Sequence, residues 1–160
     1  MVRKIINPFD TELNKCFGCG PHNPAGLKLQ FTECDGELHA SWQPSEYYQG
    51  YPGVLHGGII ATLLDETAAW FVYTIIGTAG VTYGMNIRYH KPVYINEGEV
   101  RITAKLISKE NKNALIFCQL LNKNNRLCAE AEINYYLYPV DIAKERYKYP
   151  GKELFYSNNV

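Results

Sequence analysis

The segment from Gln49 to Glu66 decides the fold of this chain, and it reads Gln-Gly-Tyr-Pro-Gly-Val-Leu-His-Gly-Gly-Ile-Ile-Ala-Thr-Leu-Leu-Asp-Glu. From Ile60 to Ile75 the apolar residues recur three and four positions apart, which is the spacing of a helix stripe. This spacing predicts a helix from about Gly57 to Ile76, ended by the glycines that follow. Because the helix carries few charges, we expect it to be buried on most sides.

Alternation of apolar and polar residues surrounds this helix on both sides in the sequence. It predicts strands at 27–31, 37–42, 85–89, 100–106, 114–121 and 127–137. Short turns between these runs favour antiparallel neighbours. The predicted fold class is therefore α+β, with an antiparallel sheet of five to six strands wrapped around one long central helix.

Length and composition fit one globular domain. The chain has 160 residues, and we expect a single domain over 1–160 with an irregular segment at 1–25 and an extension at 140–160. In that extension we expect a short helix at 141–149 and a frayed tail. Lys and Arg number 16, as do Asp and Glu, which argues against a nucleic-acid partner.

The sequence also predicts where the protein works. Asp65 and Glu66 interrupt the most apolar stretch, 54–81, which argues against a membrane span. The N-terminal residues lack the apolar core of a signal peptide. The chain has five cysteines, an odd number. We therefore expect free thiols and a cytoplasmic location.

Two features of the helix are unusual for a plain core element. Each glycine of Gly57-Gly58 costs about 1 kcal/mol against Ala in a helix, unless a backbone or a ligand must come close. The free amides of a first helical turn can hold a polarised carbonyl oxygen, although a tight turn is the simpler explanation of the glycines. Asp65 is a carboxylate in an apolar helix, so it must be paired, protonated, solvated or used. Glu66, its neighbour, is expected to be solvated or salt-bridged.

These residues carry a resemblance to a known family. The pattern His56-Gly57-Gly58, with Asp65 further along, resembles the hotdog-fold acyl-CoA thioesterases of the phenylacetate-pathway (PaaI-like) type. The run Cys16-Phe-Gly-Cys-Gly-Pro-His-Asn-Pro-Ala-Gly-Leu27 resembles the N-terminal signature of one branch, and 81–89 resembles the strand after the family helix. The resemblance spans about 16–138. It implies a hotdog fold and a homo-oligomer, dimer or dimer of dimers, that hydrolyses acyl-CoA without a cofactor.

The resemblance also implies roles for single residues. Asp65 takes the place of the general base or nucleophile, and the Gly57 amide that of the oxyanion donor. His56 takes the place of the residue that positions this turn, and Thr82 that of the hydroxyl that helps to hold the attacking water. Many relatives have Asn where this chain has Gly50, so Gln49 is a candidate for the missing amide.

Contacts to the substrate are expected at Gly58 and at two lysines. The phosphates of CoA need cations at the mouth of the site, and Lys109 and Lys112 near a turn are candidates. Solvated turn lysines are the simpler explanation. No Gly-x-Ser-x-Gly motif is present, which argues against the α/β-hydrolase route.

Two other functions compete with hydrolysis. One is an acyl-CoA binding module on the same fold, against which Asp65 argues. The other is a zinc-stapled interaction protein, since Cys16, Cys19 and His22 have ligand-like spacing and Cys34 or His39 is a conceivable fourth ligand. Because no second Cys or His pair completes a finger and glycines and prolines fill the segment, we expect a tight turn and no metal.

Helix geometry predicts that the site lies between two subunits. At about 1.5 Å per residue, Asp65 lies roughly 13 Å along the axis from His56, too far to reach a carbonyl held at Gly57 of its own helix. The carboxylate should therefore come from a second subunit whose helix runs antiparallel alongside. Small residues facing Asp65 would let the helices approach: Gly58, Ala61, Thr62, Ala68, Ala69 and Val72.

Overall fold

The apolar stripe after His56 forms α1 (Gly57–Phe71), in a computed structural model that describes residues 1–9 and 11–156. A π-helical turn, η2 (Val72–Ile76), continues the helix to the predicted end. Gly77 then takes a left-handed backbone conformation with φ of 89° and stops the helix. The helix predicted over 57–76 is therefore confirmed.

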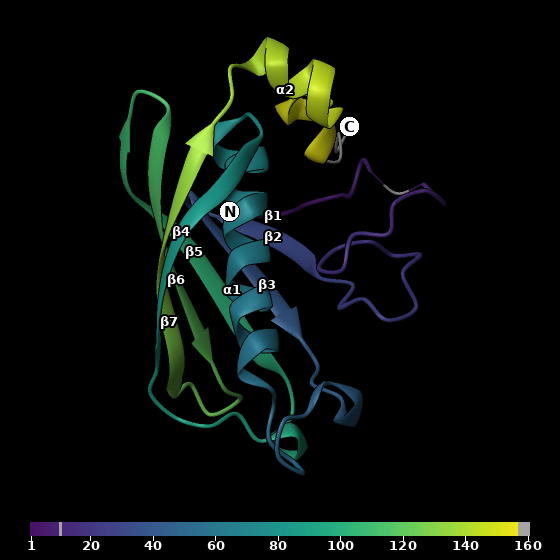
Figure 1. The fold of residues 1–160 in the computed structure, drawn as a ribbon, viewed down its shortest axis with the longest axis vertical. Helices are drawn as coiled ribbons and strands as arrows, with labels where there is room; N and C mark the ends of the chain where they lie inside the picture. The colour runs from purple at the N-terminus through teal and green to yellow at the C-terminus, as the bar shows by residue number, and fades with distance from the viewer. Residues whose placement is uncertain (10, 157–160) are drawn as a thin grey trace.

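One antiparallel sheet wraps around α1 (Figure 1). Its strands lie in the order β1-β2-β3-β5-β6-β7-β4. Their bounds are β1 Val2–Lys4, β2 Gln30–Cys34, β3 Glu37–Trp42, β4 Gly80–Tyr89, β5 Val100–Glu110, β6 Asn113–Leu121 and β7 Leu127–Leu137. Short helical turns η1 (Glu46–Tyr48) and η3 (Ile95–Glu97) lie in the connections on either side of α1 and β4.

The predicted α+β architecture is confirmed, and the sheet has seven strands instead of five to six. The additional strand is β1, which lies in the segment 1–25 expected to be irregular. It pairs with β2, and the guanidinium of Arg3 forms an ion pair with Glu33. A three-residue strand of this kind depends on partners far along the chain, which local alternation does not reveal.

The second strand begins later than its sequence pattern predicts. Lys28 has φ of 54°, a left-handed conformation that interrupts an extended run. Leu27 and Leu29 are buried as predicted, but their amides donate to the carbonyls of Phe17 and Gly18. These residues therefore fasten the N-terminal segment, and the sheet starts at Gln30.

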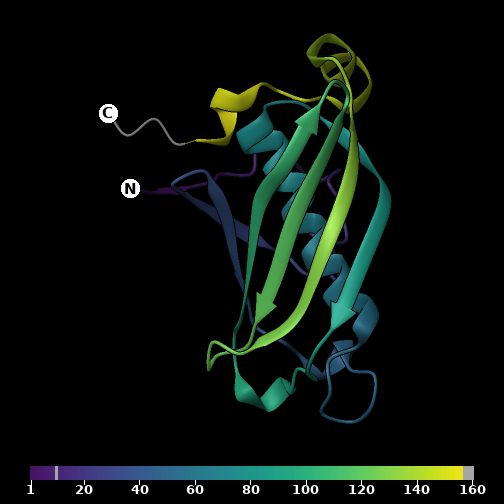
Figure 2. The same ribbon diagram turned by 90° about the vertical axis from the view of Figure 1, so that its left-hand side faces the viewer.

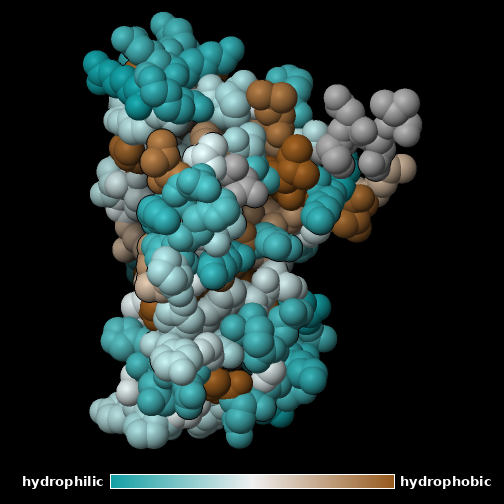
Figure 3. All heavy atoms as spheres, turned by 90° about the vertical axis from the view of Figure 1, so that its right-hand side faces the viewer, coloured by the Kyte–Doolittle hydropathy of each residue, from teal (hydrophilic) through white to brown (hydrophobic). Residues whose placement is uncertain are grey.

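The core lies between the sheet and α1. In the face-on view α1 crosses behind the sheet (Figure 2). Leu63, Leu64 and Ala68 of the helix are fully buried there. The face that carries the N-terminal segment is largely hydrophilic, with apolar side chains in separate groups (Figure 3). Burial of one helix by one sheet thus supplies the main hydrophobic stabilisation.

By length and composition alone, Gly57–Ile76 also resembles a membrane span. Its mean hydropathy is 1.5 even though it contains Asp65 and Glu66. These two charges alone therefore do not rule out a membrane span, contrary to the expectation from the sequence. Half of this apolar stretch is buried inside the protein. A core helix has the same length and composition, and α1 packs against the sheet as a core helix does.

The C-terminal extension closes the far end of α1. It contains the helix α2 (Val140–Tyr147), near the predicted bounds, and the turn η4 (Lys152–Phe155). The tail expected to fray is ordered here as far as Tyr156, and Phe155 is fully buried. Residues 157–160 lie outside the described residues.

Side chains of this extension bond to the carbonyls of η2. The hydroxyl of Tyr149 donates to the Tyr73 carbonyl at 2.9 Å, and that of Tyr156 donates to the Thr74 carbonyl at 3.1 Å. The ammonium of Lys152 donates to a third carbonyl at 3.0 Å. The terminal carbonyls of a helix need such partners, so the extension is part of the folded domain.

Candidate active site

The first turn of α1 leaves one amide open. His56 caps the helix, and its Nδ1 accepts a hydrogen bond of 2.8 Å from the Gly58 amide. The His56 carbonyl accepts from the amides of Ile59 and Ile60 at 3.0 and 3.1 Å. Among the described residues, none accepts a hydrogen bond from the Gly57 amide. Of these first four amides, that of Gly57 is therefore available to an incoming oxygen.

The two glycines of this turn differ in how much space surrounds them. A Cβ at Gly58 would lie 3.0 Å from Nδ1 of His56, so a side chain there would crowd the capping imidazole. A Cβ at Gly57 would lie 3.6 Å from the ring of Tyr89, an ordinary contact. His56 caps this turn, and its expected role in the site, like that of Gly58 as a substrate contact, stays a prediction.

A pocket of about 210 Å³ opens beside the free amide. The hydroxyl of Tyr89 donates to the Gly57 carbonyl at 2.8 Å and so ties the end of β4 to the start of α1. Lys91 brings a cation to this pocket, a position that the sequence analysis did not single out. The lining residues are Leu55, Gly57, Ile60, Tyr89, His90, Lys91, Pro92 and Val93.

Asp65 is half-buried and held by two hydroxyl groups. Thr82 on β4 donates to its Oδ1 at 2.7 Å, and Tyr135 on β7 donates to the same oxygen at 2.9 Å. The Tyr135 hydroxyl also lies 3.0 Å from the Asp65 carbonyl oxygen. Among the residues in the described ranges, none donates to Oδ2. One carboxylate oxygen is thus fixed and the other is open to a proton or a carbonyl carbon.

The chemistry of these two hydroxyl groups suits an ionised carboxylate. Burial, with the charge of Asp65 beside it, raises the pKa of Tyr135 far above its usual range, so Tyr135 stays a neutral donor. Thr82 contacts the carboxylate directly, and its expected role in holding water stays a prediction. Sequence alternation predicts Tyr135 only as part of the apolar face of its strand, although a buried tyrosine hydroxyl normally needs a partner.

Gln49 and the two lysines differ in how they lie relative to Gly57. The Gln49 side-chain oxygen accepts from the Gly53 amide at 3.1 Å, so it is engaged in its own loop. Lys109 and Lys112 lie at the β5–β6 turn. The Lys112 carbonyl accepts a hydrogen bond from the Leu137 amide, and Leu137 pairs with Gly80 at the start of β4. That is the opposite end of β4 from Tyr89, so neither lysine of the same chain lies near the free amide.

Two expectations about α1 are wrong. Glu66 is not solvated or salt-bridged in the described part of the chain: it is half-buried and accepts from the Trp70 indole N–H at 3.1 Å. Ala68 and Val72 are buried in the core, so they cannot contact a second helix. The open face around Asp65 consists of Gly58, Ala61, Thr62 and Ala69, which are exposed or half-buried.

Comparison with known proteins gives this site a context. The sequence profile of the thioesterase superfamily matches residues 52–129, which include the free amide, Asp65 and Thr82. Residues 52–129, just under half of the chain, are therefore similar to the thioesterase superfamily. The expected hotdog thioesterase fold is confirmed by solved structures as well. A thioesterase superfamily protein is 26% identical with a TM-score of 0.69, over 78% of this chain and 60% of that one.

Two curated proteins similar to this chain carry the name acyl-coenzyme A thioesterase. Acyl-coenzyme A thioesterase 13 of Mus musculus is 39% identical over 54% of this chain and 62% of its own length. Acyl-coenzyme A thioesterase THEM4 of Xenopus laevis is 28% identical over 61% of this chain and 43% of its own length. The chain thus matches less than two thirds of either relative. A hypothetical thioesterase of Streptococcus pneumoniae, solved with coenzyme A, has a TM-score of 0.62 at 21% identity, over 66% of this chain and 84% of that one, and shares the fold.

Proposed function

We propose that the protein hydrolyses acyl-CoA thioesters, in a homodimer whose sites combine Gly57 of one subunit with Asp65 of the other. The observation that carries this proposal is the distance between a free hydrogen-bond donor and a free carboxylate oxygen on the same helix. The Gly57 amide and the Asp65 Oδ2 are both without a partner among the described residues, and they lie eight residues apart on α1, about 12 Å along the axis. A base must come within hydrogen-bond reach of its proton, directly or through one water.

In the proposed reaction the thioester oxygen accepts a hydrogen bond from the Gly57 amide, which stabilises the negative charge that develops there. Asp65 takes a proton through Oδ2 from the water that attacks the carbonyl carbon. The carbon–sulfur bond then breaks, and the CoA thiolate takes up the proton. Direct attack by Oδ2 on the carbon, followed by hydrolysis of the anhydride, is the alternative route.

The exposed edge of the sheet provides a way to form the dimer. β4 is a ten-residue edge strand, and its Val81, Tyr83 and Tyr89 side chains are 38%, 59% and 53% exposed. A long, exposed edge of this kind is a template for pairing with a second strand. Antiparallel pairing of two β4 strands would extend the sheet through both subunits and place the two α1 helices side by side.

The hydrogen bonds of β4 suggest its register in such a pair. Thr82 is bonded to Asp65, and Tyr89 is bonded to Gly57. Pairing that sets Thr82 opposite the partner's Tyr89 therefore brings Asp65 towards the partner's Gly57. The same register brings the turn with Lys109 and Lys112 towards the other subunit's site, where these lysines would act. Association into a dimer of dimers is compatible with this arrangement.

The substrate class rests on the relatives and on the local charge. The two curated relatives carry the name acyl-coenzyme A thioesterase, and one structural neighbour holds coenzyme A. Lys91 at the pocket beside Gly57 offers a cation to the phosphates of CoA. We further propose a cytoplasmic location, which five free thiols support.

The test is a hydrolysis screen over short-chain, long-chain and aromatic acyl-CoAs, in which the released CoA thiol is measured. Asp65→Asn keeps the shape of the side chain and should lower kcat roughly 10²–10⁴-fold, the range for loss of a general base. Asp141→Asn, on the exposed face of α2, is the matched control and should leave kcat unchanged. Acyl-CoA binding without hydrolysis by the wild type would favour a binding module on the same fold, and absence of both would refute the proposal.

A further inference from the structure

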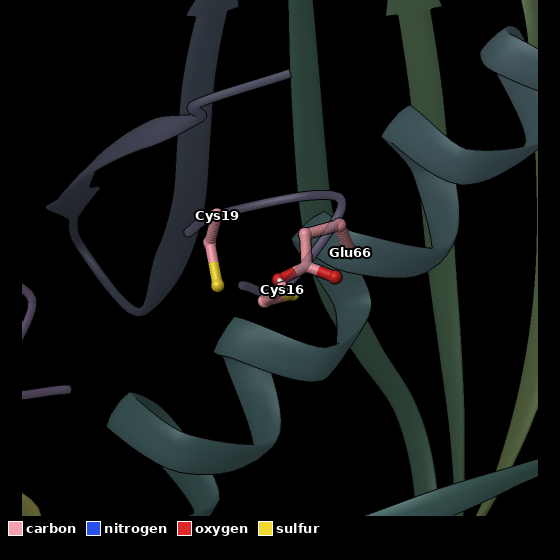
Figure 4. Close-up of side chains that lie close together, drawn as sticks. All are labelled: Cys16, Cys19 and Glu66. Atoms are coloured by element: carbon pink, nitrogen blue, oxygen red, sulfur yellow. Dashed lines mark hydrogen bonds between the residues drawn. The ribbon is translucent and has the colours of Figure 1, made fainter. Parts of the chain in front are cut away.

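A cluster of three potential metal ligands lies where the N-terminal segment meets α1 (Figure 4). Cys16 and Cys19 come from a turn in the N-terminal segment, and Glu66 comes from the middle of the helix. One ligand atom from each residue lies within 4.8 Å of the other two. The sequence spacing reveals the two cysteines but not the glutamate, which is 47 or more positions away.

The turn is shaped to admit the carboxylate. A Cβ at Gly18 would lie 2.4 Å from Cδ of Glu66, and a Cβ at Gly20 would lie 2.6 Å from the backbone of Cys16. Real side chains do not tolerate such distances, so both glycines provide space. Backbone bonds fix the turn: the Gly20 amide donates to the Cys16 carbonyl at 2.9 Å, and the Gly18 carbonyl accepts from Leu29 at 2.9 Å.

Without a metal, the three acidic groups of the cluster compete for protons, and the hydrogen bond with Cys16 and burial raise the pKa of Cys19 far above its usual range. The Cys19 thiol, followed by the amides of Cys19 and Gly18, lowers the pKa of Cys16 to about 5 by hydrogen bonding. Burial, together with the charge of Cys16, raises the pKa of Glu66 to about 7. No ion pair between described residues includes Glu66. A half-buried group of this kind is stabilised by a bound cation.

We propose that Cys16, Cys19 and Glu66 bind one zinc ion, with water as the fourth ligand. Two thiolates favour zinc over magnesium or calcium, which prefer oxygen ligands. At a tetrahedral angle, a zinc–sulfur bond of about 2.3 Å and a zinc–oxygen bond of about 2.0 Å hold the two ligand atoms about 3.5 Å apart. Sγ of Cys16 lies 3.6 Å from Oε1 of Glu66, close to this separation.

The proposed ligand set differs from the one that sequence spacing suggests. Cys34 lies on β2 beside Asp35, His39 lies on β3 near Glu37, and neither belongs to the cluster, nor does His22. The expectation of no metal rests on the lack of a second Cys or His pair. The proposal departs from that expectation because α1 places Glu66 beside the two cysteines as a third potential ligand.

The zinc ion would tie the N-terminal turn to α1 one residue beyond Asp65. Metal that binds the folded state stabilises it by mass action, so zinc at about 100 times its Kd should raise Tm by about 5–10 °C. This proposal is independent of the proposed hydrolysis. Its readouts are metal content, the spectrum of a bound probe metal and thermal stability.

The experiment uses the full chain, reduced, incubated with zinc and desalted, with metal measured by elemental analysis. We expect about one zinc per chain for the wild type. Titration with Co²⁺ should produce the thiolate-to-cobalt charge-transfer band in the near ultraviolet. Glu66→Gln keeps an acceptor for Trp70 and should lower zinc affinity at least about tenfold, as loss of a ligand does. Cys16→Ser should abolish the charge-transfer band or reduce it strongly.

Matched controls separate this site from general thiol binding. Cys34→Ser removes a thiol outside the cluster and should retain both zinc and the cobalt band. Gly18→Ala should lower zinc affinity without removing a ligand, because the new methyl group displaces Glu66. Metal-free wild-type protein after reconstitution, or unchanged affinity in Glu66→Gln, would overturn the proposal. Circular dichroism of each variant identifies a loss of folding. If a ligand variant is unfolded, the zinc affinity of Gly18→Ala and the cobalt spectrum of the wild type test the proposal instead.

Discussion

Mixed dimers of two inactive variants should recover activity, because each proposed site takes the oxyanion donor from one subunit and the base from the other. Asp65→Asn removes the base. Gly57→Pro removes the donor, since proline has no amide hydrogen. In a dimer of one chain of each kind, one site has both lesions and the other has neither.

The structure indicates that Gly57→Pro keeps the helix. Proline is favoured at the first helical position, and the preceding His56 has φ of −63° and ψ of 134°, the extended conformation that a residue before proline prefers. Loss of one oxyanion donor should lower kcat roughly 10²–10³-fold. Gly57→Ala retains the amide, and its Cβ makes only an ordinary contact of 3.6 Å with Tyr89. It is therefore the matched control and should remain active.

The assay unfolds the two variants together, refolds them and measures acyl-CoA hydrolysis. Random pairing makes about half of the dimers mixed, each with one intact site of two, so about a quarter of wild-type activity should return. Mixed dimers purified through two different affinity tags should have about half of it. Purified mixed dimers as inactive as their parents would refute the shared site, since a site within one chain gains nothing from mixing.

Three further variants test separate parts of the structure. Tyr135→Phe removes one hydrogen bond to Asp65 and should lower kcat roughly tenfold with KM unchanged; an unaltered kcat would mean that Tyr135 does not orient the base. Lys91→Ala should raise KM for acyl-CoA several-fold with little effect on kcat, as steady-state kinetics would show. Phe155→Ala should lower the free energy of unfolding in urea by about 3–5 kcal/mol, and a loss below about 1 kcal/mol would contradict its role in the core.

Local periodicity predicts the central elements of this fold well. The stripe from Ile60 to Ile75 places α1 and η2, and alternation places β3 and β7 at their observed bounds. These elements bury one face along their whole length, so apolar residues mark the buried face and polar residues mark the exposed face. The strand predicted at 27–31 fails at Lys28, because a single left-handed residue is invisible to alternation.

The site is predictable in part for the same reason. A motif marks His56, Gly57 and Asp65, and the family resemblance marks Thr82. The structure bonds Thr82 to Asp65 and the Gly58 amide to His56. Tyr135 has the polarity of a core residue, and its hydroxyl finds Asp65 only through pairing of strands distant in sequence. The position of Glu66 likewise depends on where the N-terminal turn folds back.

The side chains that close the end of α1 also constrain the order of folding. The carbonyls of Tyr73 and Thr74 receive their hydrogen bonds from Tyr149 and Tyr156, some 76 and 82 positions later in the chain. On the ribosome, the helix is complete long before these partners emerge. Its last turn must therefore remain hydrated until synthesis reaches the extension, and only then can the domain complete its cooperative folding.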